Sequence, residues 1–207
     1  DIQEIANKER LPLQVIQLDV NDDASIRDSI EKVESENERI DVLVNNAGYG
    51  LVGAFEDLSV EEIKSQFETN FFGVIRLTQQ VLPIMRKQKS GTIVNVSSGA
   101  GRIGFPGMSA YVSSKFALEG LSESMSYELE PFGIKVIIIE PGVIRTNFKK
   151  NSVISKKSLD NSSISPYSTI IQKIDSSISS IIEHATPPEE VANAILHAIT
   201  SNNPELR

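Results

Sequence analysis

The stretch that decides the fold is Ile134–Ile139, which reads IKVIII. A strand that is apolar on nearly every residue is typical of a parallel sheet covered by helices on both faces. Other short apolar stretches also predict strands, and they lie at Leu13–Leu18, Asp41–Asn45 and Thr92–Val96. Amphipathic helical segments separate these strands. Such alternation predicts an α/β fold with a parallel sheet and right-handed crossovers.

Four segments carry the signals of helices. They lie after the first strand (apolar positions Ile26, Ile30 and Val33), from Ser59 to about Pro83, from about Ser109 to Leu129, and from Thr186-Pro187-Pro188-Glu189 onward. Ser59 and Glu62 form a capping-box signature at the start of the second helix. Pro83 is expected to kink the end of that helix, because proline removes a backbone donor.

Composition excludes several classes of function. The net charge of -8 and the pI near 4.9 argue against nucleic-acid binding, which favours a basic patch. The sequence contains no cysteine, no stretch of about 18 apolar residues and no visible signal peptide. Its two histidines, His184 and His197, are isolated and are expected on helix surfaces rather than in a zinc site. We therefore expect a single cytoplasmic domain over residues 1–207, without a metal.

The character of the chain changes after Phe148. Residues 151–182 are rich in Ser, Asn and Ile. Five isoleucines fit one helix face, whereas the serine content lowers helix propensity, and these isoleucines are Ile170, Ile174, Ile178, Ile181 and Ile182. We interpret this part of the chain as a mobile segment over a site rather than a layer of the core.

The stretch Tyr111–Lys115, which reads YVSSK, carries the most informative chemistry. It places a phenol and an ammonium four residues apart, on one face of a helix. A cation beside the Tyr111 hydroxyl favours the phenolate and lowers a pKa that is ordinarily about 10. Such a tyrosine exchanges protons near neutral pH. Taken alone, Tyr111 and Lys115 could equally be an exposed pair on a helix. Only their combination with Ser98, at the end of a strand, points specifically to an active site.

Further polar or small residues follow the other predicted strands. Asn45–Gly48 closes the second strand and Pro141–Thr146 follows the fourth, at the sheet edge where α/β proteins bind ligands. Each stretch alone is equally a plain turn. Asn70 lies inside the apolar stripe of its helix, and a buried amide needs hydrogen-bond partners. On position alone the simpler interpretation is a bond to its own helix, but beside a Tyr/Lys pair a functional role is favoured.

In order and spacing, these features resemble the classical short-chain dehydrogenase/reductase family over roughly residues 13–148. The matching features are Asn45–Gly48, Asn70, Ser98, Tyr111–Lys115 and Pro141–Thr146. Lys115–Gly120 and Glu130–Gly133 are most similar to the hydroxysteroid and retinol dehydrogenase branch. The resemblance implies a three-layer, Rossmann-like doubly wound parallel sheet, with residues 147–185 as the substrate lid.

The resemblance also implies roles for single residues. Tyr111 is the acid/base, Ser98 polarises the substrate oxygen, Lys115 lowers the tyrosine pKa and binds the nicotinamide ribose, and Asn70 holds a proton-relaying water. The cofactor, NADP or NAD with NADP slightly favoured, is expected to contact Tyr111 and Lys115 and a further set: Asp19, Val20, Asn45, Ala47, Gly48, Pro141, Gly142, Val143 and Thr146. The implied activity interconverts a secondary alcohol with a ketone or aldehyde that is apolar, as steroids, retinoids and fatty compounds are.

The chain departs from the family pattern at its start. The glycine-rich turn that cradles the cofactor's pyrophosphate at a helix N-terminus is not in the sequence, which also does not begin with Met. We therefore expect the first βαβ segment and the final strand to be missing, which would leave Gln14–Leu18 unpaired and one edge of Val42–Asn45 exposed. On this basis the 207 residues should bind dinucleotide weakly. Micromolar NADPH binding in a titration of the chain would contradict that expectation.

Two other functions stay open. A non-catalytic binding or regulatory protein of the same fold would not need all of Asn70, Ser98, Tyr111 and Lys115. An epimerase or dehydratase of a related extended fold also uses Tyr and Lys, but the loop at Pro141–Thr146 favours the dehydrogenase. The resemblance further implies a homodimer or homotetramer that pairs the helices at residues 59–88 and 109–130.

Overall fold

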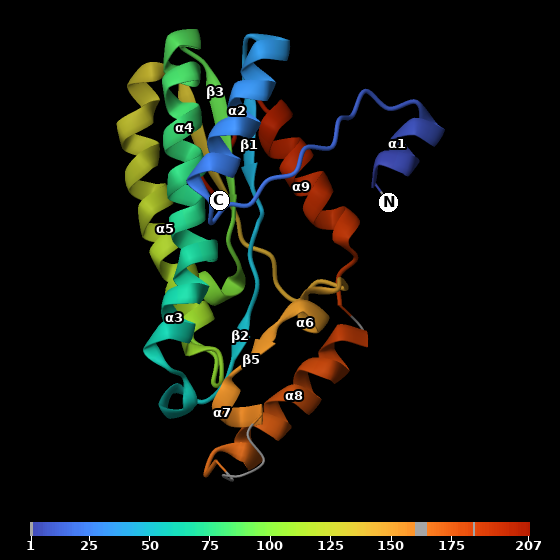
Figure 1. Cartoon of the computed structure of the whole chain (residues 1–207), viewed down its shortest axis with the longest axis vertical. Coiled ribbons are helices and arrows are strands. Elements are labelled where there is room, and N and C mark those ends of the chain that lie inside the picture. Colours follow the sequence, from blue (N-terminus) through green and yellow to red (C-terminus); the bar gives the residue numbers. More distant parts are fainter. Residues whose placement is uncertain (1, 160–164, 184) are drawn as a thin grey trace.

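A three-stranded parallel sheet forms the centre of the computed structural model, which describes residues 2–159, 165–183 and 185–207 (Figure 1). Its strands stand in the order β1 (Val42–Asn45), β3 (Gly91–Val96) and β4 (Ile134–Ile139). The predicted α/β fold is confirmed, and these strands match three of the four expected from the sequence. The register sets Asn45 opposite Asn95, so two amide side chains meet near the carboxyl ends of these strands.

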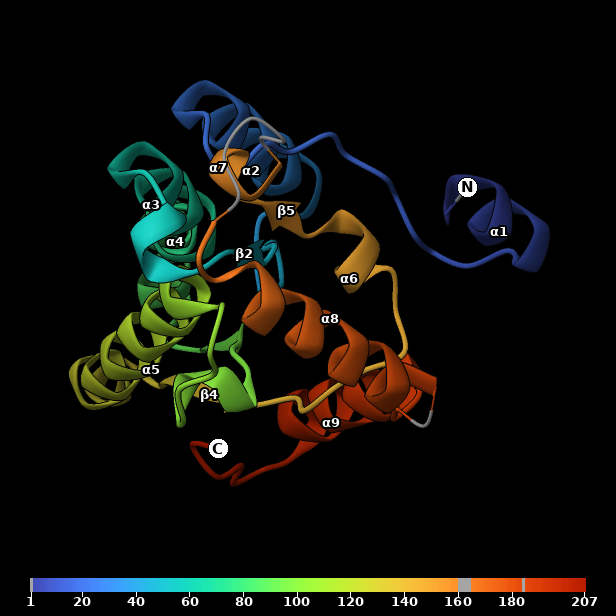
Figure 2. The same cartoon turned by 90° about the horizontal axis from the view of Figure 1, so that it is seen from below.

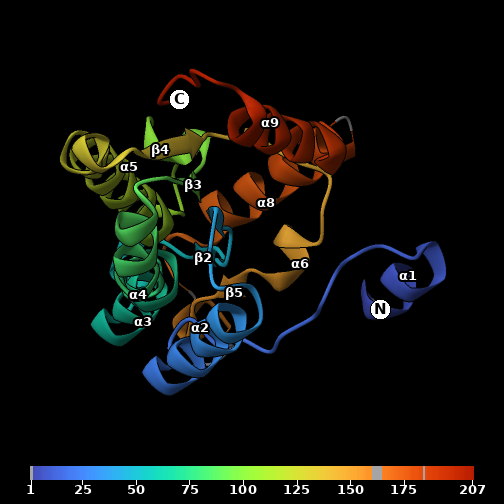
Figure 3. The ribbon, with the colours of Figure 1, turned by 90° about the horizontal axis from the view of Figure 1, so that it is seen from above.

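Helices cover both faces of this sheet, as its apolar strands predicted. Helices α4 (Gly73–Gln88) and α5 (Ser109–Leu129) pack on one face, and α9 (Pro188–Thr200) packs on the other (Figures 1 and 3). Adjacent residues of β3 point to opposite layers: Ile93 joins the core beneath α4, whereas Val94 packs with Ala198 of α9. Helix α2 (Asp23–Asn37) lies against the outer side of α4.

A nearly continuous helix carries Asn70 past the sheet. Helix α3 (Val60–Phe67) begins at the predicted capping box, in which Ser59 and Glu62 satisfy each other's backbone donors. It continues through the π-helical turn η2 (Glu68–Phe72) into α4. Pro83 lies inside α4 rather than at its end, and the helix runs on to Gln88. The fully buried Val81 and Met85 on either side of the proline hold the helix against the core.

The first predicted strand is not formed. Residues 12–18 run as an irregular segment, and Leu13, Val15 and Leu18 are 44%, 51% and 40% exposed. In the described part of the chain β1 pairs with β3 alone, so this segment lacks the neighbour that a strand's backbone groups require. The short helix α1 (Ile2–Glu9), which precedes it, stands away from the rest of the molecule (Figure 1).

The described residues 147–159 and 165–183 gather below the sheet (Figures 1 and 2). They form α6 (Phe148–Asn151), β5 (Val153–Ile154), α7 (Lys156–Leu159) and α8 (Ser168–Glu183), and β5 pairs in parallel with β2 (Leu51–Val52). Short 3₁₀ turns complete the fold: η1 (Phe55–Asp57), η3 (Gly99–Gly101) and η4 (Glu130–Phe132). The helical periodicity of the isoleucines was therefore a better guide than the low propensity of serine.

Two observations concern the residues that the structure describes. No helix among them is both long and apolar enough to cross a membrane. Their His, Asp and Glu side chains form no cluster that would hold a metal ion. His197 lies exposed on α9 as predicted, whereas His184 is outside the described residues.

Candidate active site

Tyr111 and Lys115 lie one turn apart on α5, and both are buried, with 7% and 6% of their surface exposed. The Lys115 ammonium lies over the Tyr111 ring, 5.8 Å from its centroid, and donates a hydrogen bond of 2.8 Å to the carbonyl of Val96. Ser98 follows β3, and its hydroxyl accepts from the backbone N–H of Ala100 at 3.1 Å. The Ser98 side chain is also near enough to the Tyr111 phenol to lower the pKa of that phenol. The fold thus brings the predicted Ser, Tyr and Lys together at the carboxyl end of the sheet.

The protonation of Tyr111 differs from the sequence-based expectation. Burial raises the pKa of the phenol above its ordinary value, and the Ser98 hydrogen bond lowers it by less. Burial outweighs the lowering that was expected from Lys115, whose ammonium lies over the ring and is bound to the Val96 carbonyl. At neutral pH Tyr111 is therefore a neutral phenol, which is the form that donates a proton.

Burial acts in the opposite direction on Lys115. It lowers the pKa of the ammonium to about 8, and the charge of Glu119 opposes this by raising it. An ammonium has three N–H donors. One of them meets Val96 in the described part of the chain, which leaves donors for an incoming hydroxyl group.

Asn70 lies in the π-helical turn and is 1% exposed. Its Oδ1 accepts from the backbone N–H of Tyr49 at 3.1 Å, and its Nδ2 donates to the Tyr49 carbonyl at 3.0 Å and to the Ser114 hydroxyl at 3.3 Å. The amide thus ties the loop after β1 to α5, and its partners lie outside its own helix. π-turns often occur at functional sites.

The hydrogen bonds of the Asn70 amide leave room only for a glycine at position 48. A Cβ atom added at Gly48 would lie 3.1 Å from Oδ1 of Asn70, whose amide is fixed by hydrogen bonds and has little room to move. We therefore expect Gly48→Ala to destabilise the protein by about 1–3 kcal/mol. Urea unfolding measures the effect, with Gly104→Ala as control, since a Cβ there meets nothing within 4 Å. Equal stability of the two variants would contradict the claim that the fixed Asn70 amide requires glycine at position 48.

The Asn45 side chain points into the core. Its Nδ2 donates to the hydroxyl of Thr78 at 3.2 Å and to Oδ1 of Asn95 at 2.8 Å, and Asn95 donates in turn to Ser122 on α5 at 2.8 Å. This buried network joins β1, β3, α4 and α5. Sequence reasoning missed Asn95 and Ser122, although an Asn inside an apolar strand signals a buried amide with partners.

A hollow of about 210 Å³ opens at the carboxyl end of β1. Three of the predicted cofactor residues line it, namely Val20, Asn45 and Ala47. Asp19 lies next to Val20 in the turn before α2, where its carboxylate accepts from the backbone of Asn21 at 2.9 Å. This hollow and the donors of Lys115 fit the nucleoside part of a dinucleotide, whereas the sequence lacks a glycine-rich turn for its phosphates.

The loop after β4 lies at the same end of the sheet. The Pro141 carbonyl accepts from the backbone N–H of Gly99 at 2.9 Å, which ties the loop to the Ser98 turn. Gly142, Val143 and Thr146 are exposed, and the Thr146 hydroxyl accepts from the N–H of Phe148 at 3.2 Å. The predicted cofactor residues therefore form three groups: one around the hollow at β1, one on this loop, and Tyr111 with Lys115 on α5.

Residues 147–159 lie against the candidate active site. The Phe148 ring packs on Tyr111, with 5.7 Å between centroids. The buried carboxylate of Asp57 fastens this part of the chain. It binds the Lys157 ammonium at 2.8 Å and accepts a hydrogen bond from the Ser165 hydroxyl. The Tyr167 hydroxyl donates a hydrogen bond of 2.7 Å to Glu56, and this bond also ties the described residues after 159 to the turn that contains Asp57. Sequence reasoning missed Phe148 and Asp57, and the mobility of the segment stays a prediction.

Comparison with known proteins assigns a family to this arrangement. Residues 2–157 match the family described as short chain dehydrogenase. The 3-ketodihydrosphingosine reductase of Bacteroides thetaiotaomicron is 38% identical over 195 residues, which cover 94% of this chain and 71% of the relative. Human 17-beta-hydroxysteroid dehydrogenase type 1 is also 38% identical, over 196 residues that cover 94% of this chain and 59% of that enzyme.

Solved structures give the same result. A short-chain dehydrogenase from Streptomyces avermitilis superposes with a TM-score of 0.84 at 37% identity, over 100% of this chain and 74% of that protein. An NAD+-bound xylitol dehydrogenase superposes with a TM-score of 0.61 at 32% identity, over 64% of this chain and 51% of that protein.

Proposed function

The chain belongs to the short-chain dehydrogenase family of NAD(P)-dependent oxidoreductases, and we propose that it interconverts an alcohol with the corresponding carbonyl compound, a secondary alcohol with its ketone above all, using Tyr111 as acid/base. The observation that carries the proposal is the buried Tyr111 phenol, which lies beside Ser98 and beneath the Lys115 ammonium at the carboxyl end of the sheet.

Each side chain has a defined task. The nicotinamide cofactor, when bound, supplies or accepts the hydride. In reduction, the neutral Tyr111 phenol donates its proton to the carbonyl oxygen as that oxygen gains negative charge. The Ser98 hydroxyl hydrogen-bonds the same oxygen. Lys115 stabilises the phenolate that remains, because an adjacent cation favours the charged form. In oxidation Tyr111 acts as the base, and the proton moves in the reverse direction.

Lys115 and the hollow at β1 would hold the cofactor. The remaining N–H donors of Lys115 suit the hydroxyls of the nicotinamide ribose, and Val20 and Ala47 border the space for the nucleoside. The NAD+-bound xylitol dehydrogenase of similar fold supports a nicotinamide dinucleotide. Between the two dinucleotides we favour NADP slightly, on the resemblance to the hydroxysteroid branch.

We propose an apolar substrate. Phe148 packs directly on Tyr111, and Ile171 and Ile174 of α8 lie close to Gly107, at the entrance to α5. An aromatic ring beside the proton donor favours substrates with hydrocarbon rather than charged groups near the carbonyl. The names of the two relatives, a 3-ketodihydrosphingosine reductase and a 17-beta-hydroxysteroid dehydrogenase, support substrates of this kind.

We further propose that the protein is a cytoplasmic homodimer or homotetramer that pairs the helices at residues 59–88 and 109–130. Exposed aromatic side chains on these helices support the pairing, since Phe72, Phe116 and Tyr127 are 44%, 46% and 68% exposed. Light scattering of the purified protein tests the assembly.

A cofactor assay tests the proposed activity. Purified protein is mixed with NADPH or NADH and a panel of ketones that includes 3-keto sphingoid bases, ketosteroids and short polar ketones, and the nicotinamide absorbance is followed. We expect oxidation of the cofactor with the apolar ketones. Absence of a change with every ketone would favour the non-catalytic alternative.

A further inference from the structure

Glu119 is a buried carboxylate one helical turn beyond Lys115. Both residues lie on α5 at positions i and i+4, so their side chains lie on the same face of the helix. Glu119 is 5% exposed, and its side chain approaches Gly101, where an added Cβ would lie 2.9 Å from its Cγ. An ionised carboxylate is rarely buried without a compensating charge, so this position needs a physical reason.

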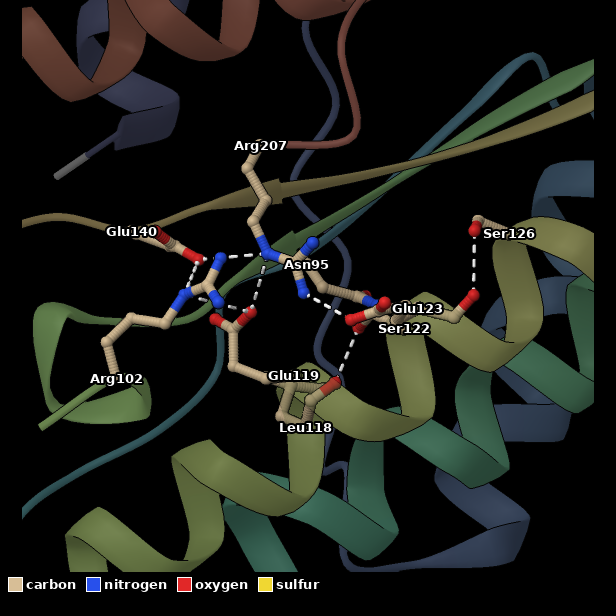
Figure 4. Close-up of polar contacts among 9 residues, drawn as sticks. All are labelled: Asn95, Arg102, Leu118, Glu119, Ser122, Glu123, Ser126, Glu140 and Arg207. Carbon is tan, nitrogen blue, oxygen red and sulfur yellow. Dashed lines mark hydrogen bonds and ion pairs between the residues drawn. The ribbon is translucent and has the colours of Figure 1, made fainter.

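Two guanidinium groups supply part of that compensation (Figure 4). Nε of Arg207, at the C-terminal end of the chain, lies 3.3 Å from Oε2 of Glu119, and Nε of Arg102 lies 4.0 Å from the same oxygen. Both arginines also bind Glu140, which follows β4, at 3.3 and 2.7 Å. Arg207 reaches Glu123 as well, at 2.7 Å. The group therefore contains three carboxylates and two guanidiniums, and the carboxylates are in excess.

The excess charge matches that of Lys115. Burial raises the pKa of Glu119, and the Ser97 hydroxyl and Arg207 lower it while Glu140 raises it further. Around Lys115, the titratable groups in the described part of the chain are Tyr111, which is neutral, and Glu119, whose charge favours the ammonium. The carbonyl of Val96 is the remaining polar contact. Across one helical turn, the charge of Glu119 therefore opposes the effect of burial on Lys115.

We propose that Glu119 is a positioning residue that keeps Lys115 charged beside Tyr111, and that Arg102 and Arg207 keep the Glu119 carboxylate ionised. The inference rests on the proposed function of Tyr111 and Lys115 and extends it to a second layer of charge. Through Arg207, the segment that follows α9 contacts Glu119.

A purely structural role for Glu119 makes a different prediction. If Glu119 only fastened Arg207 to α5, then Glu123, which also binds Arg207, would be its equivalent. Glu123 lies two turns from Lys115 and its side chain is 47% exposed, so its charge is screened by water. Glu123→Gln is therefore the matched control for Glu119→Gln.

The test measures the pKa of Lys115 directly. The rate at which an amine-reactive reagent labels Lys115 is followed against pH by peptide mass spectrometry, in the full chain and without substrate. We expect Glu119→Gln to lower the pKa of Lys115 by roughly one unit. Glu123→Gln should change it by less than about 0.3 unit. An unchanged or raised pKa in Glu119→Gln, or equal shifts in both variants, would overturn the inference.

Arg207→Gln provides a second variant if Glu119→Gln fails to fold. Loss of the guanidinium raises the pKa of Glu119 further, so the labelling curve of Lys115 should shift in the same direction as in Glu119→Gln, by a smaller amount. An unshifted curve would contradict the role of Arg207. Labelling does not depend on turnover, and so it separates the two proposals: an inactive wild-type enzyme would refute the activity, whereas an unshifted Lys115 would refute the role of Glu119.

Discussion

Replacing Tyr111 by Phe is expected to lower the turnover rate by at least about 1,000-fold, because the substrate oxygen loses its proton donor. The fold should be retained. The phenol is buried beside Ser98, and loss of one buried hydroxyl costs about 1 kcal/mol of stability. Steady-state rates with the best ketone of the panel, together with urea unfolding, measure the two effects separately.

Tyr127→Phe is the matched control for this substitution. Tyr127 lies on the same helix but is 68% exposed, so loss of its hydroxyl should leave the rate unchanged. If Tyr111→Phe kept more than about a tenth of the wild-type rate, Tyr111 would not be the acid/base, since such groups contribute at least about 100-fold.

Replacing Lys115 by Met is expected to abolish activity and, at the same time, to stabilise the protein. The lowering of the ammonium's pKa from 10.5 to about 8 corresponds to on the order of 3 kcal/mol of destabilisation at neutral pH. A methionine of similar length removes this cost. The Val96 carbonyl loses a donor, which costs about 1 kcal/mol, so the net gain is about 2 kcal/mol. The rate should fall at least about 100-fold.

The stability gain in Lys115→Met should depend on pH. Because the folded-state pKa of Lys115 lies below its unfolded value, the folded protein binds fewer protons between about pH 8 and pH 10.5. Wild-type stability therefore rises through this window, and the advantage of the variant is full below about pH 8 and vanishes above pH 10.5. Urea unfolding of both proteins at neutral and alkaline pH gives this difference. A variant that is less stable than wild type at neutral pH would contradict the account.

Hydrophobic patterns predicted a strand or helix correctly where the elements that it packs against belong to this chain. Ile134–Ile139 and Ser109–Leu129 have the predicted boundaries, because both bury apolar residues between sheet and helices. Leu13–Leu18 has an equally good strand pattern and forms no strand. The backbone N–H and C=O groups of a strand need a neighbouring strand to pair with, and the sequence of the strand itself does not show whether that neighbour exists.

The sequence placed Ser98, Tyr111 and Lys115 together but predicted their electrostatics wrongly. Spacing on a helix shows that two side chains are neighbours, whereas a pKa depends on burial and on the direction of the charged atom. Burial dominates for Tyr111, and the Val96 carbonyl binds the ammonium.

Contacts between distant parts of the chain were beyond prediction from sequence. The packing of Phe148 on Tyr111 and the ion pair of Arg207 with Glu119 join residues that are far apart in the chain and belong to no local pattern. Within the helix, however, the acid four residues after Lys115 was visible and would have indicated a charge partner.

The most direct measurement of the central claim is hydride transfer itself. NADPH or NADH deuterated at C4 of the nicotinamide is incubated with the enzyme and an apolar ketone, and the alcohol is analysed by mass spectrometry. We predict one deuterium on the carbinol carbon with the wild-type enzyme and none above background with Tyr111→Phe. Alcohol formed without deuterium, when either face of the nicotinamide is labelled, would contradict the account.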